Sequence, residues 1–224
     1  MSKIKKTAFS VAVATGVLTS GQSMAAMEAN IGVANNYIWR GMTQTQDQAS
    51  ISGGLDYSAD DSGFYLGTWT SNVDFGEDAT STGYELDFYG GIASEQDGFG
   101  YDLGYIYVAY PSMDDSDFSE VYLNLLLGGL TLGVALQVDA DFTDEDYLYM
   151  SAGYDVEISE EWGMGFHWGK YDRKDDTDSE GGIIKDVTHY GISASKGDFG
   201  FAVDKNDLDN DDDPRVTVSW SKTF

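Results

Sequence analysis

Acidic side chains recur at every second position inside segments that are otherwise apolar. The pattern is clearest where Tyr84, Leu86 and Phe88 alternate with Glu85 and Asp87. Successive side chains of a β-strand point to opposite faces, so this spacing places the carboxylates together on one face of a strand. Carboxylates that line a lumen raise the local concentration of cations, as rings of Asp or Glu do in cation channels. The chemistry that the spacing predicts is cation attraction.

Charged side chains occupy the same polar register in many of the alternating segments. We expect the interior of a barrel to be lined by Arg40, Asp56, Glu85, Asp87, Asp102, Glu120, Asp139, Asp155, Asp204 and Arg215, with His167 and His189 on the same face. Acidic groups dominate this set, which indicates a pore for cations or small polar solutes. The alternative is that the two arginines pair with the carboxylates and fill the lumen. About 8 strands enclose a filled interior and about 16 an open channel, so both readings stay open.

Arg40-Gly41 is the most distinctive pair among these positions. In the expected first strand, Arg40 points inward at the outer end. It either lines the mouth of the pore or bridges carboxylates of adjacent strands and holds the rim in place.

Metal binding and catalysis are poorly supported by the motifs. The acidic run from Asp207 to Asp211 lacks the glycine and the bidentate glutamate of an EF-hand loop, and the run from Asp139 to Asp146 is read as solvated charge. The two histidines stand in no nucleophile motif, and neighbouring carboxylates on one strand more simply line a wall. We expect no enzyme, no metal and no cofactor. A structural or adhesive barrel with a filled lumen, and an outer-membrane hydrolase, are the alternatives.

The elements that carry these residues are about twelve alternating segments of the length that suits a tilted membrane-crossing strand. Short links alternate with longer acidic ones. The short links are expected at Ser58 to Gly63, Ser94 to Gly98, Gly128-Gly129, Ile158 to Glu161 and Lys196 to Asp198. This alternation predicts an all-β fold, a transmembrane up-and-down antiparallel β-barrel with short turns and both termini at the periplasmic end.

The placement of aromatic residues distinguishes the membrane barrel from the alternative fold, a soluble β-sandwich. They gather near the strand ends, where we expect two membrane girdles: Tyr37, Trp39 and Trp168 beside long loops, and Tyr57, Phe64, Phe99, Trp162, Trp220 and Phe224 beside short turns. Aromatic belts at two interfaces are typical of membrane barrels, and a sandwich has no reason for them. The expected partner of the outer face is the lipid bilayer.

The composition fits an exported barrel. The chain has 39 acidic residues, a net charge of −27, no cysteine, two prolines and 14% aromatic residues. Such acidity argues against nucleic acid as a partner, because phosphates are held by Lys and Arg. The aromatic content and the persistent alternation argue against disorder. Few prolines suit long strand ladders, because proline removes a ladder donor.

The amino terminus resembles an export signal. Lys3, Lys5 and Lys6 precede an apolar run over residues 7–18, and Ser23-Met24-Ala25 supplies the small residues of a cleavage site. We expect residues 1–25 to be a signal peptide, cleaved after Ala25, and residues 26–224 to form a single outer-membrane barrel domain. A membrane anchor is the alternative, but the apolar run is well short of the ~20 residues that a spanning helix needs.

Two stretches carry a resemblance to known proteins. The last strand, Arg215-Val-Thr-Val-Ser-Trp-Ser-Lys-Thr-Phe224, looks like the carboxy-terminal signal of bacterial outer-membrane barrels, which implies recognition of Phe224 by the barrel assembly machinery. Asn36-Tyr-Ile-Trp-Arg-Gly-Met-Thr-Gln-Thr-Gln46, Ser52-Gly-Gly-Leu-Asp-Tyr57 and Gly63-Phe-Tyr-Leu-Gly-Thr-Trp-Thr-Ser-Asn-Val-Asp-Phe75 resemble the TorF-type porins, a proteobacterial outer-membrane family of poorly defined function. The resemblance implies a small channel in the bacterial outer membrane and names no solute.

Overall fold

The structure is a computed structural model that describes residues 26–59, 62–76, 82–174, 176, 184–209 and 213–224. The expected signal peptide, residues 1–25, lies outside the described residues, as does Asp211 of the acidic run. Among the described residues, no helix is long and apolar enough to cross a membrane.

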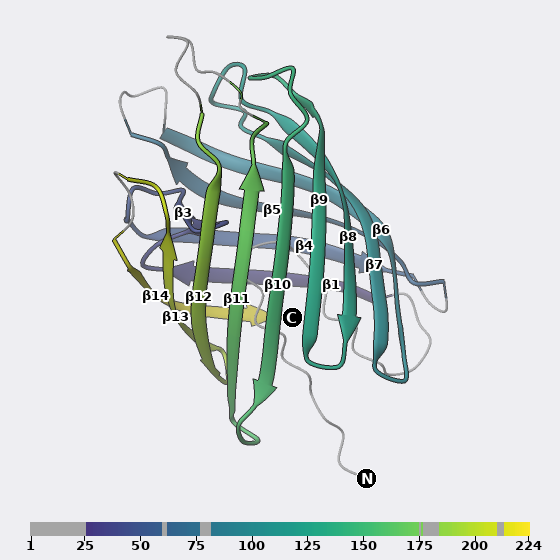
Figure 1. The fold of residues 1–224 in the computed structure, drawn as a ribbon. Helices are drawn as coiled ribbons and strands as arrows, with labels where there is room; N and C mark the ends of the chain where they lie inside the picture. Colours follow the sequence, from purple (N-terminus) through teal and green to yellow (C-terminus); the bar gives the residue numbers. More distant parts are fainter. Residues whose placement is uncertain (1–25, 60–61, 77–81, 175, 177–183, 210–212) are drawn as a thin grey trace.

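Twelve antiparallel strands close into a barrel (Figure 1). They are β1 (Ala26–Ala34), β4 (Ser50–Ser58), β5 (Phe64–Asp74), β6 (Thr82–Gln96), β7 (Phe99–Ala109), β8 (Phe118–Leu127), β9 (Leu130–Ala140), β10 (Leu148–Glu157), β11 (Trp162–Asp172), β12 (Val187–Lys196), β13 (Phe199–Asn206) and β14 (Arg215–Thr223). Two short strands, β2 (Ile38–Trp39) and β3 (Met42–Thr43), form a separate hairpin. The predicted fold class is confirmed.

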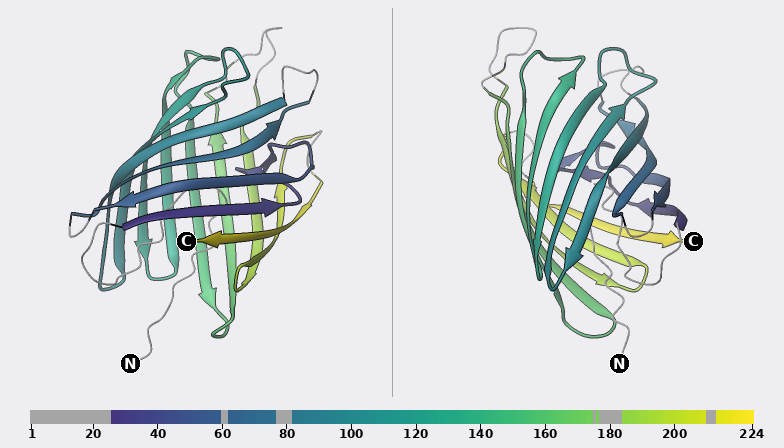
Figure 2. Two further views of the ribbon diagram at one scale, coloured as in Figure 1. Left: turned by 180° about the vertical axis from the view of Figure 1, so that it is seen from behind. Right: turned by 90° about the vertical axis from the view of Figure 1, so that its right-hand side faces the viewer.

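The connections alternate between short and long, as the sequence predicts. Short turns cover residues 97–98, 128–129, 158–161 and 197–198, at the end where β4 finishes and β5 begins, and the segments at the opposite end are longer. The start of β1 and the end of β14 therefore lie at the short-turn end. Figure 2 shows that β1, β4 and β5 cross the barrel at a strong tilt to the strands on its far side, as barrel closure requires.

The first and last strands complete the barrel. Val33 of β1 pairs with Trp220 of β14, and the backbone N–H of Phe224 donates to the carbonyl of Ala29 at 2.8 Å. Closure hydrogen-bonds both edges of the sheet. This is required in lipid, because an unpaired backbone group there costs several kcal/mol.

The outer face of the barrel is apolar and exposed. Ile51 on β4 is 65% exposed and Phe166 on β11 is 47% exposed. Seven of the predicted girdle aromatics occupy outward register positions: Tyr57, Phe64, Phe99, Trp162, Trp168, Trp220 and Phe224. Exposed aromatics near the long-loop end that the sequence reading overlooked are Tyr84, Tyr105 and Tyr190.

The prediction is wrong for Tyr37 and Trp39, which do not lie on the outer face. β1 ends at Ala34, and the side chain of Asn35 bonds to the backbone of β14, accepting from the Val218 N–H at 2.6 Å. The chain then turns into the barrel instead of continuing outward, so Tyr37 is buried and Trp39 packs against interior rings. A polar residue at position 35, where the alternation calls for an apolar one, is the signal of this departure.

A β-bulge between β8 and β9 also moves one predicted lining residue. Glu120 pairs with Gln137 but Ser119 pairs with Asp139, so β9 carries one extra residue. Directly opposed residues share a face, and Ser119 accepts a hydrogen bond from the outward Tyr105. Asp139 therefore lies exposed on the outer side near the loop end, and its assignment to the lumen is wrong because the extra residue reverses the alternation.

Candidate functional site

Residues 35–49, which we name the inner loop, fold back into the barrel. The β2–β3 hairpin pairs Trp39 with Met42, and its two tip residues, Arg40 and Gly41, have φ of 47° and 78°. Positive φ at both central residues is the signature of the type I′ turn that two-residue hairpins favour. The Arg-Gly pair therefore forms the tip of a hairpin inside the barrel, and the prediction that Arg40 ends the first strand is wrong.

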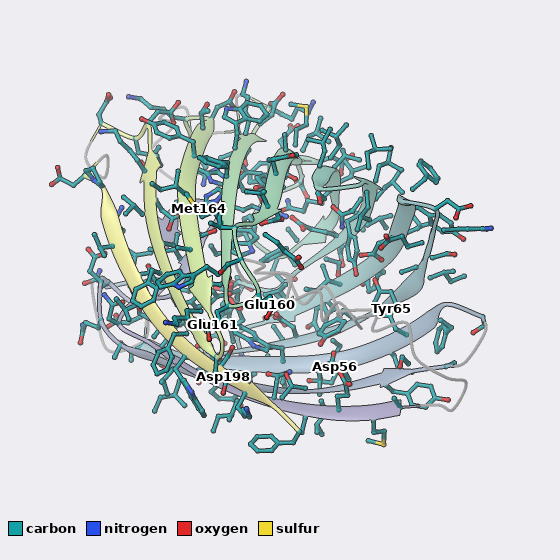
Figure 3. The ribbon with its side chains drawn as sticks, turned by 90° about the horizontal axis from the view of Figure 1, so that it is seen from below. Asp56, Tyr65, Glu160, Glu161, Met164 and Asp198 are labelled. Carbon is teal, nitrogen blue, oxygen red and sulfur yellow. The ribbon has the colours of Figure 1, made fainter. Side chains whose placement is uncertain are left out.

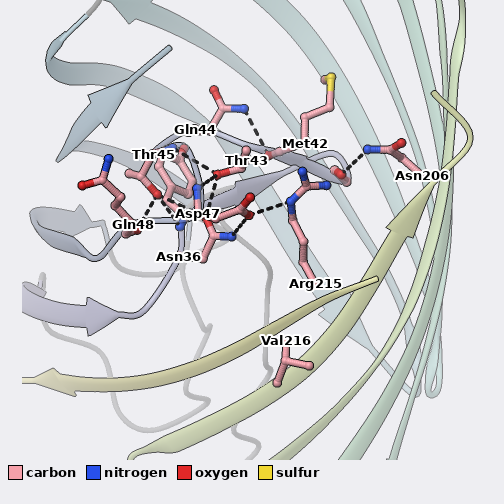
Figure 4. A network of polar contacts seen from close by, with 12 residues as sticks. Asn36, Met42, Thr43, Gln44, Thr45, Asp47, Gln48, Asn206, Arg215 and Val216 are labelled. Carbon is pink, nitrogen blue, oxygen red and sulfur yellow. Dashed lines mark hydrogen bonds and ion pairs between the residues drawn. The ribbon is translucent and has the colours of Figure 1, made fainter. Parts of the chain in front are cut away.

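The base of the inner loop is held by its own polar side chains (Figure 4). Asn36 donates to Asp47 at 2.7 Å and accepts from the Thr43 hydroxyl at 2.7 Å. Thr45 accepts from the backbone N–H of Tyr37 and donates to the carbonyl of Gln48. These bonds make the loop a compact unit.

Arg40 is the principal contact between the loop tip and the wall. Its guanidinium donates two hydrogen bonds to the Glu120 carboxylate, at 2.7 and 2.6 Å, and both side chains are 5% exposed. The guanidinium carbon lies 4.0 Å from the ring centroid of Tyr149, 4.2 Å from that of Trp39 and 5.0 Å from that of Tyr171. Planar stacking and a bidentate carboxylate are the two contacts that arginine makes best. Arg40 is thus paired with a single carboxylate on the distant strand β8 and, among the described residues, does not bridge carboxylates of the strands next to β1.

Other strands also hold the inner loop. The Tyr37 hydroxyl donates to Glu85 of β6 at 2.7 Å, and the Asn206 amide donates to the carbonyl of Gly41 at 2.8 Å. The Arg215 guanidinium donates to Asp47 at 2.7 Å (Figure 4). The loop is thus attached to walls on several sides of the interior.

A second group of carboxylates lies toward the short-turn end. Asp56 accepts from the hydroxyl of Tyr89, and Asp102 accepts from the hydroxyl of Tyr65 at 2.6 Å. Tyr65 is also within hydrogen-bonding distance of Tyr122, at 2.5 Å. Figure 3 views the barrel from this end, where Asp56 and Tyr65 are labelled on the neighbouring strands β4 and β5.

The two histidines of the chain meet on the wall formed by β11 and β12. Their ring centroids are 5.7 Å apart. His167 Nε2 lies 2.9 Å from Asp204, and His189 Nε2 lies 2.9 Å from the Tyr149 hydroxyl. Among the described residues their partners are a carboxylate and a phenol, whereas a nucleophilic site needs a serine in contact with the histidine. No group of three or more His, Cys, Asp or Glu side chains in the described part of the chain is arranged to hold a metal ion.

The remaining predicted lining residues lie on the inner side. Glu85, Asp87, Asp102, Glu120 and Asp204 are buried, Asp155 lies beside the inward Gly165, and Arg215 pairs in register with Asp204. The predicted set of lining residues omits the inner tyrosines: Tyr65, Tyr89, Tyr122, Tyr149 and Tyr171. Each sits at a polar position of its strand, and an aromatic residue out of phase with the apolar face is the signal that identifies them.

Comparison with known sequences assigns a family. The sequence model of Gcw_chp, described as a bacterial protein of unknown function, matches residues 19–222. The chain belongs to this family. The match does not confirm the TorF-type resemblance, and no curated protein matches the sequence.

Solved structures share the fold of this chain. A KdgM porin matches with a TM-score of 0.54 and 7% identity, covering 90% of this chain and 99% of the porin. A KdgM porin in complex with disordered oligogalacturonate matches with a TM-score of 0.52 and 7% identity, covering 90% and 98%. The barrel of this Gcw_chp protein is therefore the fold of an outer-membrane porin.

Proposed function

We propose that this protein is an outer-membrane channel for passive diffusion of small polar solutes, with a preference for cations. The observation that carries the proposal is the contrast between the two faces of a closed barrel. The outer face is apolar, and the inner face carries the carboxylates Asp56, Asp87, Asp102 and Asp155, among others. A carboxylate-rich interior attracts cations and repels anions.

The amino and carboxyl ends support export to this membrane. Residues 1–25 have the form of a cleavable signal, and the aromatic Phe224 directly follows β14, which suits recognition by the barrel assembly machinery. Lipid is the partner of the outer face. The ligand of the similar KdgM porin, an oligogalacturonate, carries carboxylates. An acidic interior disfavours such an anionic solute, so the solutes proposed for this protein are positively charged.

The inner loop favours a second candidate function. It occupies the long-loop half of the interior and is anchored by Arg40, Tyr37 and Asp47. A barrel closed permanently by this loop would serve a structural or adhesive role. The two functions differ in whether the purified protein conducts.

Planar bilayers under a salt gradient test both. The channel predicts single-channel conductance with a reversal potential displaced toward that of the cation. No conductance would leave the structural role, and anion preference would refute the argument from interior charge.

Replacement of the carboxylates near the short turns, Asp56→Asn with Asp102→Asn and Asp155→Asn, should reduce cation preference. Asp139→Asn is the matched control, because this carboxylate lies on the outer side.

A further inference from the structure

We propose that Glu120, Tyr149 and Tyr171 form a binding site for planar organic cations of the guanidinium class, and that Arg40 of the inner loop occupies this site as a built-in ligand. The proposal names a solute class for the channel. It rests on the proposed function for its role in transport, whereas binding itself can be measured without conduction.

The contacts around Arg40 are those of a recognition site. The Glu120 carboxylate accepts from both terminal nitrogens of the guanidinium, at 2.7 and 2.6 Å. The rings of Tyr149 and Tyr171 lie 4.0 and 5.0 Å from its central carbon. Aromatic faces attract cations through the ring quadrupole, and a carboxylate matches the planar pair of N–H donors. Together they select a flat cation with two parallel donors.

The barrel wall builds this site without help from the loop. Glu120 comes from β8, and Tyr149 and Tyr171 are directly paired on β10 and β11. The Tyr149 hydroxyl is bonded to His189, and the Tyr171 hydroxyl donates to Gln137 at 3.5 Å. The register shift between Ser119 and Glu120 lies at the carboxylate itself, and bulges often re-aim a side chain beside a functional site. The site is therefore organised in advance of its occupant.

The occupant fits the site only in part. Arg40 has a left-handed backbone, which is uncommon for a residue other than glycine, and its buried Nε has no hydrogen-bond partner among the described residues. The wall recognises the terminal nitrogens and the flat faces of the guanidinium. A free guanidinium solute carries these same groups and no strained backbone.

A solute that enters this site must displace Arg40. The loop tip is covalently attached, so its effective concentration at the site is high, in the millimolar range for short flexible links. Displacement would release the loop tip from β8, β10 and β11 together. The contacts of Tyr37 with Glu85 and of Gly41 with Asn206 lie outside this site, so entry of the solute would loosen the loop tip while the rest of the loop stays attached.

The test uses Arg40→Ala in detergent micelles with methylguanidinium chloride as the probe. The variant empties the site, so millimolar methylguanidinium should raise the melting temperature by about 2 to 4 °C. The wild type, whose site is filled, should show no rise at the same concentration. Methylurea, a flat neutral molecule, and potassium chloride at equal concentration should raise neither.

The double variant Arg40→Ala with Glu120→Gln is the matched control. It retains the empty space and both tyrosines but lacks the carboxylate, and it should lose the response to methylguanidinium. An equal response in this control, or no response in Arg40→Ala, overturns the proposal. If Arg40→Ala does not refold alone, refolding is repeated with methylguanidinium: recovery of folded protein supports the site, and no recovery refutes it. Absence of conductance in the wild type and in both variants would refute the channel and leave the binding result intact.

Discussion

Arg40 and Glu120 lie 80 residues apart in the chain and meet inside the barrel as a bidentate ion pair shielded from solvent. Loss of one partner of a buried pair leaves an uncompensated charge, which costs about 3 to 5 kcal/mol, whereas replacement of both partners by apolar residues is often neutral. Glu120→Leu should therefore lower the free energy of unfolding by about this amount. Arg40→Met combined with Glu120→Leu should recover most of it.

Urea unfolding of the protein in lipid vesicles measures this cycle. Equal losses in Glu120→Leu and in the double variant would show that the pair does not couple the inner loop to β8. Conductance recorded on the same proteins reports whether the loop tip has moved.

Gly41 permits a close approach between the loop tip and β12. Its φ is 78°, and an added Cβ would overlap the Cβ of His189. Gly41→Ala should displace the hairpin tip, at about 1 to 3 kcal/mol for the overlap, and increase conductance. The matched control is Gly128→Ala, where φ is 64° and no atom of the described residues lies within 4 Å of the added Cβ. Both variants carry the cost of a left-handed backbone, so their difference in unfolding free energy isolates the overlap, and identical values would contradict the packing described.

The barrel itself could be predicted from the sequence because the features that specify it, strand alternation and link length, can be read from short segments of the chain. Each strand repeats apolar and polar residues with a period of two, and each link is either tight or long. The alternation alone therefore predicts which face of the sheet carries Leu55 and which carries Asp56, without knowledge of the partner strands. Closure follows, since an open edge in lipid is too costly.

The inner loop could not be predicted in the same way. Tyr37 and Trp39 keep the period of the preceding strand, and their burial depends on partners far along the chain, such as Glu85 and Phe118. Asp139 was misplaced by a single extra residue, which reverses the alternation and has no local signature. One of the two readings of Arg40 expected contact with carboxylates of adjacent strands, but its actual partner, Glu120 on β8, and its aromatic neighbours required the assembled barrel.

A carboxylate outside the strands gives a pH prediction. Hydrogen bonds from Lys170 Nζ, at 2.8 Å, and then from the Arg173 backbone N–H lower the pKa of Asp186. Because this pKa is lowered, the stabilisation from the contact is fully present at pH values above the ordinary pKa of Asp. It is lost as the pH falls through the lowered pKa. Carboxyl NMR of the folded protein should show Asp186 titrating below exposed aspartates. Lys170→Met should return its pKa toward the ordinary range, and an unchanged titration would show that the contact does not persist in solution.

Neighbouring residues on β12 give the most direct test of which face meets lipid. Ile192 is 50% exposed on the outer side, and Ser193 faces inward beside Gly165. An arginine near the bilayer midplane on a lipid-facing position costs about 2 to 4 kcal/mol, so Ile192→Arg should destabilise the barrel by that amount in vesicles. Ser193→Arg places the same charge near Asp155, where it is solvated or paired, and should cost much less while reducing cation preference. Equal costs for the two arginines would refute the assignment of faces. A lower cost for Ile192→Arg than for Ser193→Arg would indicate that Ile192 faces the interior and Ser193 faces the lipid.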